Sequence, residues 1–309
     1  MVQFTGEAEL GQPYWWEAAA PGPAADVLPD HCDVLVIGAG YAGLSAAIAA
    51  HDAGAKVAVV DAGNPGAGAS SRNGGMFGAH PRLSWDQLAQ RFGPEVADGV
   101  FAEAAQALEW AKALIDEEKI DCDLQQTGRI QLAWTPQHAA GQRTLARTVS
   151  DKSSVSIQTL DRADLRQEIE TERYHGAILF PEHCGLHPAK FHRGLRRALE
   201  ARAVPVTGMA EVKQLSRDGQ RFVAQTPKGT VTADKVILCT NGYTTPAFRW
   251  HVARVFPLPS YLIATEALPP NLIGHLAPGR RMMVETRARH SYFPISPDGT
   301  RKLWVGRAS

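Results

Sequence analysis

The sequence has no long apolar run and no excess of charge of either sign, and each absence argues against a class of protein. Its longest apolar stretches, such as Val34–Ile37 and Val236–Cys239, have the length of a strand and are too short to form a transmembrane segment. Lys+Arg and Asp+Glu number 32 each, so bulk charge gives no reason to expect a nucleic-acid or anionic-membrane partner. The first ten residues contain Glu7 and Glu9 and no apolar run, which is not the pattern of a secretory signal.

Cysteine is also scarce. The four cysteines are far apart and include no CxxC pair: Cys32, Cys122, Cys184 and Cys239. This pattern predicts reduced, mostly buried thiols in a cytoplasmic protein. What remains is the composition of an ordinary globular protein, with 44% hydrophobic and 21% charged residues. A length of 309 residues is enough for about two domains.

One stretch has the residue types of a metal site, namely His183-Cys184-Gly185-Leu186-His187. A structural zinc site needs four ligands, usually in two separated pairs. No second CxxC or HxxxH pair occurs in the sequence. We therefore expect no metal, and we predict a loop in which Cys184 is buried and the two histidines face solvent.

Residues 33–61 have the pattern of a βαβ unit. Asp33–Ile37 and Lys56–Val60 are short apolar runs, and the Ala-rich segment Leu44–Ala53 between them is helical in character. Runs that are apolar on both faces suit the strands of a buried parallel sheet. Gly54 is well placed to end the helix.

The glycines of this unit are spaced for a dinucleotide. Gly38, Gly40 and Gly43 follow the first strand as GxGxxG: the first allows a tight turn, the second lets the backbone approach a pyrophosphate, and the third lets helix and strand touch. Asp61 ends the second strand 18 residues after Gly43, where a carboxylate can accept both ribose hydroxyls. The strand before the motif and the helix after it are the context that the motif requires.

A second glycine-rich loop indicates which dinucleotide is bound. Residues 66–75 read GAGASSRNGG and follow the acidic strand end almost at once. Such a loop can line the pyrophosphate and lead the chain to a flavin ring, whereas an NAD domain has no need of it. A flexible linker would favour Gly and Ser alone, and Arg72-Asn73 interrupts the run.

At this point the chain resembles the FAD-dependent oxidoreductases of the D-amino-acid oxidase type, and among them the gamma-glutamylputrescine oxidase-like amine oxidoreductases. The resemblance runs from about residue 14 to the last residue, and its most specific parts in combination are GASSRNGG (68–75) and CTNGYT (239–244). Other matching segments are GAGYAGLSAA (38–47), IDCDLQQTG (120–128), GLHPAK (185–190) and the stretch around YLIATE (261–266).

The resemblance implies FAD as cofactor and gives roles to individual residues. Gly38, Gly40 and Gly43 would hold the pyrophosphate, and Asp61 would hold the adenosine ribose, where the family usually carries Glu. Val212, in the first strand after the crossover, would lie by the adenine through its backbone. The residues implied along the pyrophosphate, near the ring or beneath the cofactor are Ser71, Arg72, Asn73, Gly74, Thr240, Asn241 and Gly242.

The sequence departs from the family in two places. Relatives continue for on the order of a hundred residues and return to the FAD domain with a last strand and a glycine-rich loop, whereas this sequence ends at Ser309. We therefore expect an incomplete, C-terminally truncated fold. Phe293-Pro294 stands where relatives usually carry a polar or basic residue. His290 and Tyr292 are candidates for lining the substrate pocket.

Further elements follow from periodicity and turn residues. An amphipathic helix is predicted over residues 96–118, with Val100 on its buried face, and a second helix begins at Pro188. An arm before residue 30 should pack onto the body through its aromatic residues at positions 14–16. The other predicted strands are Glu211–Ser216, Arg221–Thr226, Thr230–Ala233, Lys235–Cys239, Tyr261–Thr265, Ser291–Ile295 and Leu303–Val305.

The sequence therefore predicts an α/β fold in which a Rossmann-like FAD-binding domain is interleaved with a mixed-sheet substrate domain. The FAD domain would use residues 30–90 and 185–245, the substrate domain 91–184 and 246–309, and residues 1–29 would form the arm. The implied reaction is oxidation of the C–N bond of a small amine or amino acid, a gamma-glutamylputrescine-like substrate being favoured. Hydride would pass to flavin, with oxygen or another acceptor taking the electrons.

Catalysis of this kind requires no strong acid or base, and the sequence identifies no catalytic residue. Two alternatives remain open. The first is an NAD(P)-linked dehydrogenase, against which the second glycine-rich loop argues. The second is a truncated FAD-binding fragment without turnover.

Overall fold

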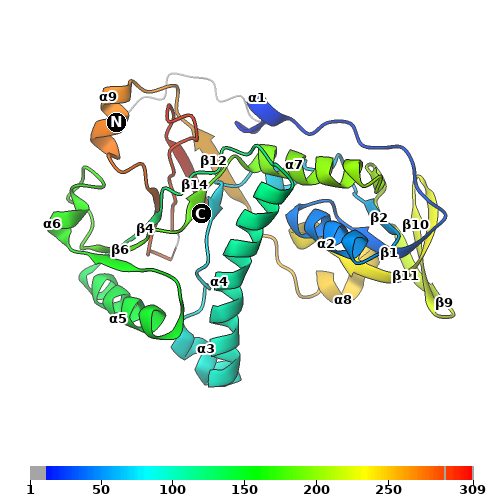
Figure 1. Ribbon diagram of the computed structural model, residues 1–309, viewed down its shortest axis with the longest axis horizontal. Coiled ribbons are helices and arrows are strands. Elements are labelled where there is room, and N and C mark those ends of the chain that lie inside the picture. Colours follow the sequence, from blue (N-terminus) through cyan, green and yellow to red (C-terminus); the bar gives the residue numbers. More distant parts are fainter. Residues whose placement is uncertain (1–11, 289, 308–309) are drawn as a thin grey trace.

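The computed structural model describes residues 12–288 and 290–307 (Figure 1). Its largest sheet has six strands in the order β8-β2-β1-β11-β10-β9. The first four of these run parallel, and β10 and β9 continue the sheet as antiparallel strands. Their bounds are β1 His31–Ile37, β2 Val57–Val60, β8 Val206–Thr207, β9 Gln214–Asp218, β10 Arg221–Thr226 and β11 Gly229–Leu238.

Helices α2 (Tyr41–Asp52) and α7 (Pro188–Ala201) cover one face of this sheet. All four residues of β2 are buried, as are the last four of β1. Leu44 of α2 and Leu195 of α7 are fully buried against them. The predicted βαβ unit is confirmed, because β1, α2 and β2 follow one another and the two strands pair in parallel. Strands that are apolar on both faces suit such a layered arrangement.

A second sheet has four strands in the order β13-β4-β6-β5, and it lies on the left of Figure 1. Helices α4 (Pro94–Glu117) and α5 (Pro136–Lys152) pack against it around the buried ring of Phe101. The predicted helix over 96–118 is confirmed, although Val100 is exposed rather than buried. The strands are β4 Arg129–Leu132, β5 Gln158–Leu160, β6 Ala177–Phe180 and β13 Met282–Glu285.

Two small antiparallel sheets complete the strands: β3 (Met76–Phe77) pairs with β7 (Cys184–Gly185), and β12 (Ser260–Ala264) pairs with β14 (Leu303–Arg307). The remaining elements are short. They are α1 Trp16–Ala19, α3 Trp85–Phe92, α6 Arg162–Leu165, α8 Arg249–Val252, α9 Pro270–Leu276 and the 3-10 turns Ala69–Ser71, Asn241–Tyr243 and Pro246–Phe248.

The strand predictions for the second half of the chain need three corrections. Thr230–Ala233 and Lys235–Cys239 are not two strands, because β11 runs unbroken from Gly229 to Leu238. The strand predicted from Glu211 begins only at Gln214, so Val212 lies before it. The predicted strand Ser291–Ile295 makes only isolated bridges, at Tyr292 and Ile295, since Pro294 has no N–H to give to a ladder.

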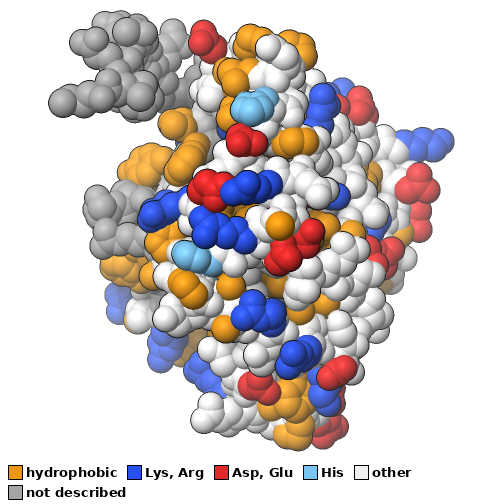
Figure 2. Space-filling view, turned by 90° about the vertical axis from the view of Figure 1, so that its left-hand side faces the viewer, with side chains coloured by type: hydrophobic (Ala, Val, Ile, Leu, Met, Phe, Trp, Pro, Cys, Tyr) orange, Lys and Arg blue, Asp and Glu red, His pale blue; other side chains and the backbone are white. Residues whose placement is uncertain are grey.

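The two larger sheets are interleaved along the chain. The six-stranded sheet takes its strands from 31–60 and 206–238, and the four-stranded sheet takes its own from 129–180 and 282–285. This confirms the α/β fold with mixed sheets, while the exact domain boundaries stay a prediction. No helix among the described residues has the length and apolarity to cross a membrane. Figure 2 shows a face on which acidic and basic side chains are interspersed, in keeping with the equal totals of the two signs.

Candidate cofactor cleft and neighbouring cavity

A cleft of about 1020 Å³ opens at the carboxyl ends of β1, β2 and β11. Ligand sites of α/β sheets lie at this edge. The chain lines the cleft with four segments that are far apart in sequence: 37–40, 60–70, 210–212 and 239–248. Of the predicted cofactor residues, it includes Gly38, Gly40, Asp61, Val212, Thr240 and Asn241.

The three motif glycines do different work. Gly38 has a φ of +106°, and a Cβ there would lie 2.5 Å from the carbonyl oxygen of Cys239, the residue that follows β11. A Cβ on Gly43 would lie 1.9 Å from the carbonyl oxygen of Gly38, so this glycine serves the helix–strand contact, as predicted. Gly40 has an ordinary extended backbone, with φ −81° and ψ −174°, and its missing side chain leaves space in the cleft.

Asp61 follows β2 directly and holds both the glycine turn after β1 and the segment after β2 at the cleft. Its Oδ2 accepts a hydrogen bond from the N–H of Ala39 at 2.7 Å, and its Oδ1 accepts one from the N–H of Gly63 at 2.9 Å. Each carboxylate oxygen can accept a second hydrogen bond, so the carboxylate can also meet a hydroxyl in the cleft. Its contact with ribose stays a prediction.

Ser71 lies outside the lining of the cleft, and its predicted place along the pyrophosphate stays a prediction. Ser71 is buried: its hydroxyl donates to the carbonyl oxygen of Gly66 and accepts the indole N–H of Trp16 at 2.7 Å. Its neighbour Ser70 lines the cleft instead, and its Oγ accepts the N–H of Tyr41 at 3.1 Å. The 3-10 turn at Ala69–Ser71 decides which hydroxyl faces inward.

Arg72 and Asn73 also lie outside the cleft lining. The Arg72 guanidinium is exposed and lies over the Trp16 ring, 4.7 Å from its centroid. The Asn73 side chain closes the loop on itself: its amide donates to the carbonyl oxygens of Ala69 and Ser70, and its Oδ1 accepts the N–H of Gly75. Both residues shape the loop, and the structure brings neither side chain to the cleft.

The N-terminal arm packs against the second glycine-rich loop. Trp15 is 2% exposed, and its indole N–H donates to the carbonyl oxygen of Asn73 at 2.8 Å. Trp16 donates to Ser71, as described above. The expectation that the aromatic residues pack onto the body is therefore confirmed, and their contacts fall on the second glycine-rich loop. Periodicity gave no signal for this, because the partners lie 55 and 58 residues apart.

Three predicted cofactor residues follow β11, and the structure places them differently. Thr240 and Asn241 line the cleft, and Asn241 has a left-handed backbone with φ +50°. A non-glycine residue in that conformation is uncommon, although Asn tolerates it. Gly242 is not part of the lining, and it packs near Pro257 instead. Sequence reasoning missed Glu211, Tyr243 and Phe248, which also line the cleft.

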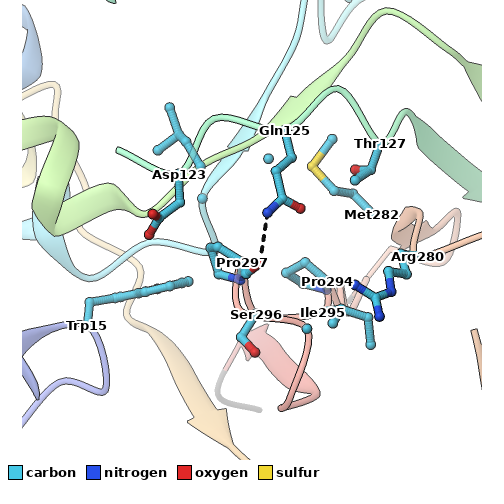
Figure 3. Close-up of a pocket in the computed structure, with 15 residues that line it drawn as sticks. Trp15, Asp123, Gln125, Thr127, Arg280, Met282, Pro294, Ile295, Ser296 and Pro297 are labelled. Atoms are coloured by element: carbon cyan, nitrogen blue, oxygen red, sulfur yellow. Dashed lines mark hydrogen bonds between the residues drawn. The ribbon is translucent and has the colours of Figure 1, made fainter. Parts of the chain in front are cut away.

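A second cavity, shown in Figure 3, lies beside Gly74 and Gly75 at the end of the same loop. Trp15, Asp123 and Arg280 also line it, and Gln125 Nε2 donates across it to the carbonyl oxygen of Pro297 at 2.8 Å. Asp123 has a φ of +52° and Arg280 a φ of +49°. Backbone strain of this kind is found preferentially at functional sites.

The two predicted substrate-pocket residues do not line this cavity. Tyr292 packs against Gly74 so closely that a Cβ on the glycine would lie 2.4 Å from Cε2 of the tyrosine. Its backbone pairs with Val305 in both directions. The ring of His290 lies 6.4 Å from that of Tyr292. Their role in substrate binding stays a prediction.

The stretch with metal-ligand residue types needs a correction. His183 and His187 are buried, at 1% and 7% exposure, and do not face solvent. His183 Nε2 accepts the N–H of Ala79, and His187 Nδ1 accepts the N–H of Lys190 at the start of α7. Burial lowers the pKa of His183 to about 3 and of His187 to about 4. Cys184 is buried as predicted.

The residues of the cleft fit FAD. Helix α2 starts at the cleft, and the positive end of its dipole is suited to hold phosphate there. Gly40 leaves room for a close approach, Asp61 supplies a carboxylate, and Val60, Val212 and Phe248 form an apolar end suited to an adenine. Fold and cleft together define a dinucleotide-binding α/β protein.

The comparison with family profiles is more specific. Residues 33–309 match the profile of the DAO family, described as "FAD dependent oxidoreductase". The chain belongs to this family, and FAD is its cofactor. This match argues against the alternative of an NAD(P)-linked dehydrogenase.

Two curated relatives are similar over most of this chain. The probable oxidoreductase OrdL of Rhizobium meliloti (strain 1021) is 28% identical over 299 residues, which are 95% of this chain and 68% of the relative. The gamma-glutamylputrescine oxidoreductase of Escherichia coli (strain K12) is 29% identical over 278 residues, which are 89% of this chain and 64% of the relative. The chain thus spans about two thirds of their length.

Solved structures share the fold. Glycine oxidase from Geobacillus kaustophilus matches with a TM-score of 0.70 at 20% identity, covering 91% of this chain and 72% of that one. L-proline dehydrogenase from P. horikoshii matches with a TM-score of 0.71 at 15% identity, covering 90% of this chain and 70% of that one.

Proposed function

We propose that this protein oxidises the C–N bond of an amine or amino acid with FAD as hydride acceptor, and that a gamma-glutamylated amine is the favoured substrate. The observation that carries the proposal is the cleft at the carboxyl ends of β1, β2 and β11, where the glycine turn, the start of α2 and Asp61 meet. The substrate preference rests on the 29% identity to the gamma-glutamylputrescine oxidoreductase.

In this proposal the chain's own residues bind and orient the cofactor. Gly40 and the first turn of α2 hold the pyrophosphate, Asp61 the adenosine ribose, and Val212 the adenine. The loop containing Ser71, Arg72, Asn73 and Gly74 leads from the pyrophosphate to the ring, and Thr240 to Gly242 lie beneath the cofactor. The flavin supplies the hydride-accepting chemistry, and oxygen or another acceptor takes the electrons.

The substrate side of the site is proposed at the cavity of Figure 3. It begins at Gly74 and Gly75, where the loop of the cofactor site ends. Asp123 in this cavity is held by an ion pair with Lys190 at 2.9 Å. The protein's task beside the ring is to exclude water and to hold the amine unprotonated. The place of His290 and Tyr292 in the lining of the substrate pocket stays a proposal.

Two measurements test the proposal. The purified protein is expected to show a flavin absorption spectrum and to release FAD on denaturation. Without oxygen, the flavin should bleach on addition of a gamma-glutamylated amine, faster than with free polyamines, simple amino acids or alcohols. Bleaching by alcohols alone would reject the amine class, and tight NAD binding without flavin would reject the cofactor.

A further inference from the structure

Arg129 is a partly buried cation that forms no ion pair with any described residue. It opens β4 and lies in register opposite Phe180 of β6, with its guanidinium carbon 4.8 Å from the centroid of the Phe180 ring. Its Nε and Nη2 are both buried, and no described residue accepts a hydrogen bond from either. Burial is the cause that lowers the pKa of Arg129 to about 10.

A second orphaned donor lies next to it. The carbonyl oxygen of His183 accepts the N–H of Gly128, the residue before Arg129. Because His183 Nε2 accepts the N–H of Ala79 at 3.1 Å, the neutral imidazole carries its proton on Nδ1. That Nδ1 is buried and has no acceptor among the described residues.

The groups around Phe180 are therefore donors and cations. The His183 ring stacks on Phe180 at 4.8 Å with an interplanar angle of 14°, and the His80 ring lies 4.9 Å away. The cationic neighbours that influence His183 are Arg129 and Lys112, and the third basic neighbour is the His80 ring. Buried donors in native proteins are almost always satisfied, and those that lack a protein acceptor commonly meet a water or an ion. A buried charge without compensation is especially costly.

We propose that Arg129, together with the Nδ1–H of His183, binds a small monovalent anion such as a halide or a carboxylate. The ion would accept hydrogen bonds from the guanidinium and neutralise its charge. It would also tie β4 and β6 to the segment at Ala79 and His80, which follows the second glycine-rich loop. The site belongs to the four-stranded sheet and lies outside the cofactor cleft and the cavity of Figure 3.

The first test is thermal stability of the FAD-loaded protein at constant ionic strength, while sodium fluoride is replaced stepwise by sodium chloride. Fluoride is strongly hydrated and serves as the non-binding salt. The midpoint of the wild type is expected to rise with chloride and then to follow the logarithm of its concentration, as for a ligand that binds only the native state. The Arg129→Met variant should show no such rise. Arg221→Met is the matched control, since Arg221 is exposed and paired with Asp234.

An equal response to chloride in the wild type and in Arg129→Met would overturn the proposal. If Arg129→Met does not fold, crystals of the wild type soaked in bromide decide the matter by anomalous scattering. A bromide peak within hydrogen-bond reach of Arg129 supports the site. The absence of a peak, or a water in its place, rejects it.

Discussion

The glycine motif shows how one sequence pattern can hide three different constraints. At Gly38 and Gly43 a side chain would collide with backbone, with the carbonyl of Cys239 in the first case and that of Gly38 in the second. Substitutions there test folding. At Gly40 the backbone is one that any residue adopts, and the nearest atom to a Cβ is the Ser70 hydroxyl at 2.9 Å. This side-chain atom can move aside by giving up its hydrogen bond to the N–H of Tyr41. Gly40 alone therefore separates cofactor binding from folding.

We predict that Gly40→Val folds and fails to bind FAD. The valine methyl groups would occupy the space that the pyrophosphate needs, and FAD affinity should fall at least about tenfold, which corresponds to about 1.4 kcal/mol. Circular dichroism and the flavin content after purification measure the two effects. Gly141→Val, in helix α5 with open space around the position, is the control and should keep its flavin. A fully yellow Gly40→Val would show that the phosphate lies elsewhere.

At this scale the sequence predicted residue types better than orientations. Spacing identified Gly38, Gly40 and Asp61, because a tight strand–turn–helix leaves little freedom at those positions. It could not choose between Ser70 and Ser71, because a 3-10 turn rotates each successive side chain to a new direction. The buried histidines His183 and His187 were also beyond prediction, since nothing local shows that their loop is covered.

At the level of elements, the N-terminal arm acts as a clamp on the second glycine-rich loop. Trp15 and Trp16 each donate an indole hydrogen bond to that loop, and Arg196 of α7 fixes the arm in turn by donating to the carbonyl oxygens of Gly22 and Pro23. The loop itself is rich in small residues that constrain the backbone little. Its conformation therefore depends on partners distant in sequence.

We predict that Trp16→Phe weakens FAD binding without unfolding the protein. The variant keeps the ring over which Arg72 lies and removes only the hydrogen bond to Ser71, which is worth about 1 kcal/mol. If loop order and cofactor binding are coupled, the dissociation constant of FAD should rise by about fivefold. Titration of the apoprotein with FAD, followed by flavin fluorescence, measures the change.

Trp110→Phe is the matched control, because Trp110 is 52% exposed on helix α4. Its FAD affinity should equal that of the wild type. Unchanged affinity in Trp16→Phe as well would mean that the arm covers the loop without ordering it.

Among elements, helices and hairpins were predictable from local pattern, and strand pairing across the chain was not. The turn signals around Gly219 and Gly229 predicted β9 and β10 to within a few residues. No local sequence pattern indicated β13, which pairs in parallel with the distant strand β4. The hydrophobic side chains of such a strand are buried against residues that lie far away in the sequence.

At the scale of the whole molecule, buried histidines couple stability to pH. His80, His183 and His187 have pKa values lowered to about 4, 3 and 4, and in each case burial is the largest cause. In the unfolded chain a histidine titrates near about 6.5. Between these values the unfolded state binds more protons than the native state, so stability is fully present above the unfolded pKa and is lost as pH falls below it.

We predict that the protein loses stability steeply between pH 6.5 and pH 4, before most carboxylates are protonated. Three histidines that charge only on unfolding give a slope of up to roughly 4 kcal/mol per pH unit. Urea unfolding midpoints measured in steps across this range, at one chloride concentration, give the slope. His187→Asn keeps an acceptor for the N–H of Lys190 and should lower the slope by roughly 1.4 kcal/mol per pH unit; His183→Gln should do the same. A wild-type stability that is flat down to pH 4.5 would mean that these imidazoles can be protonated in the folded state.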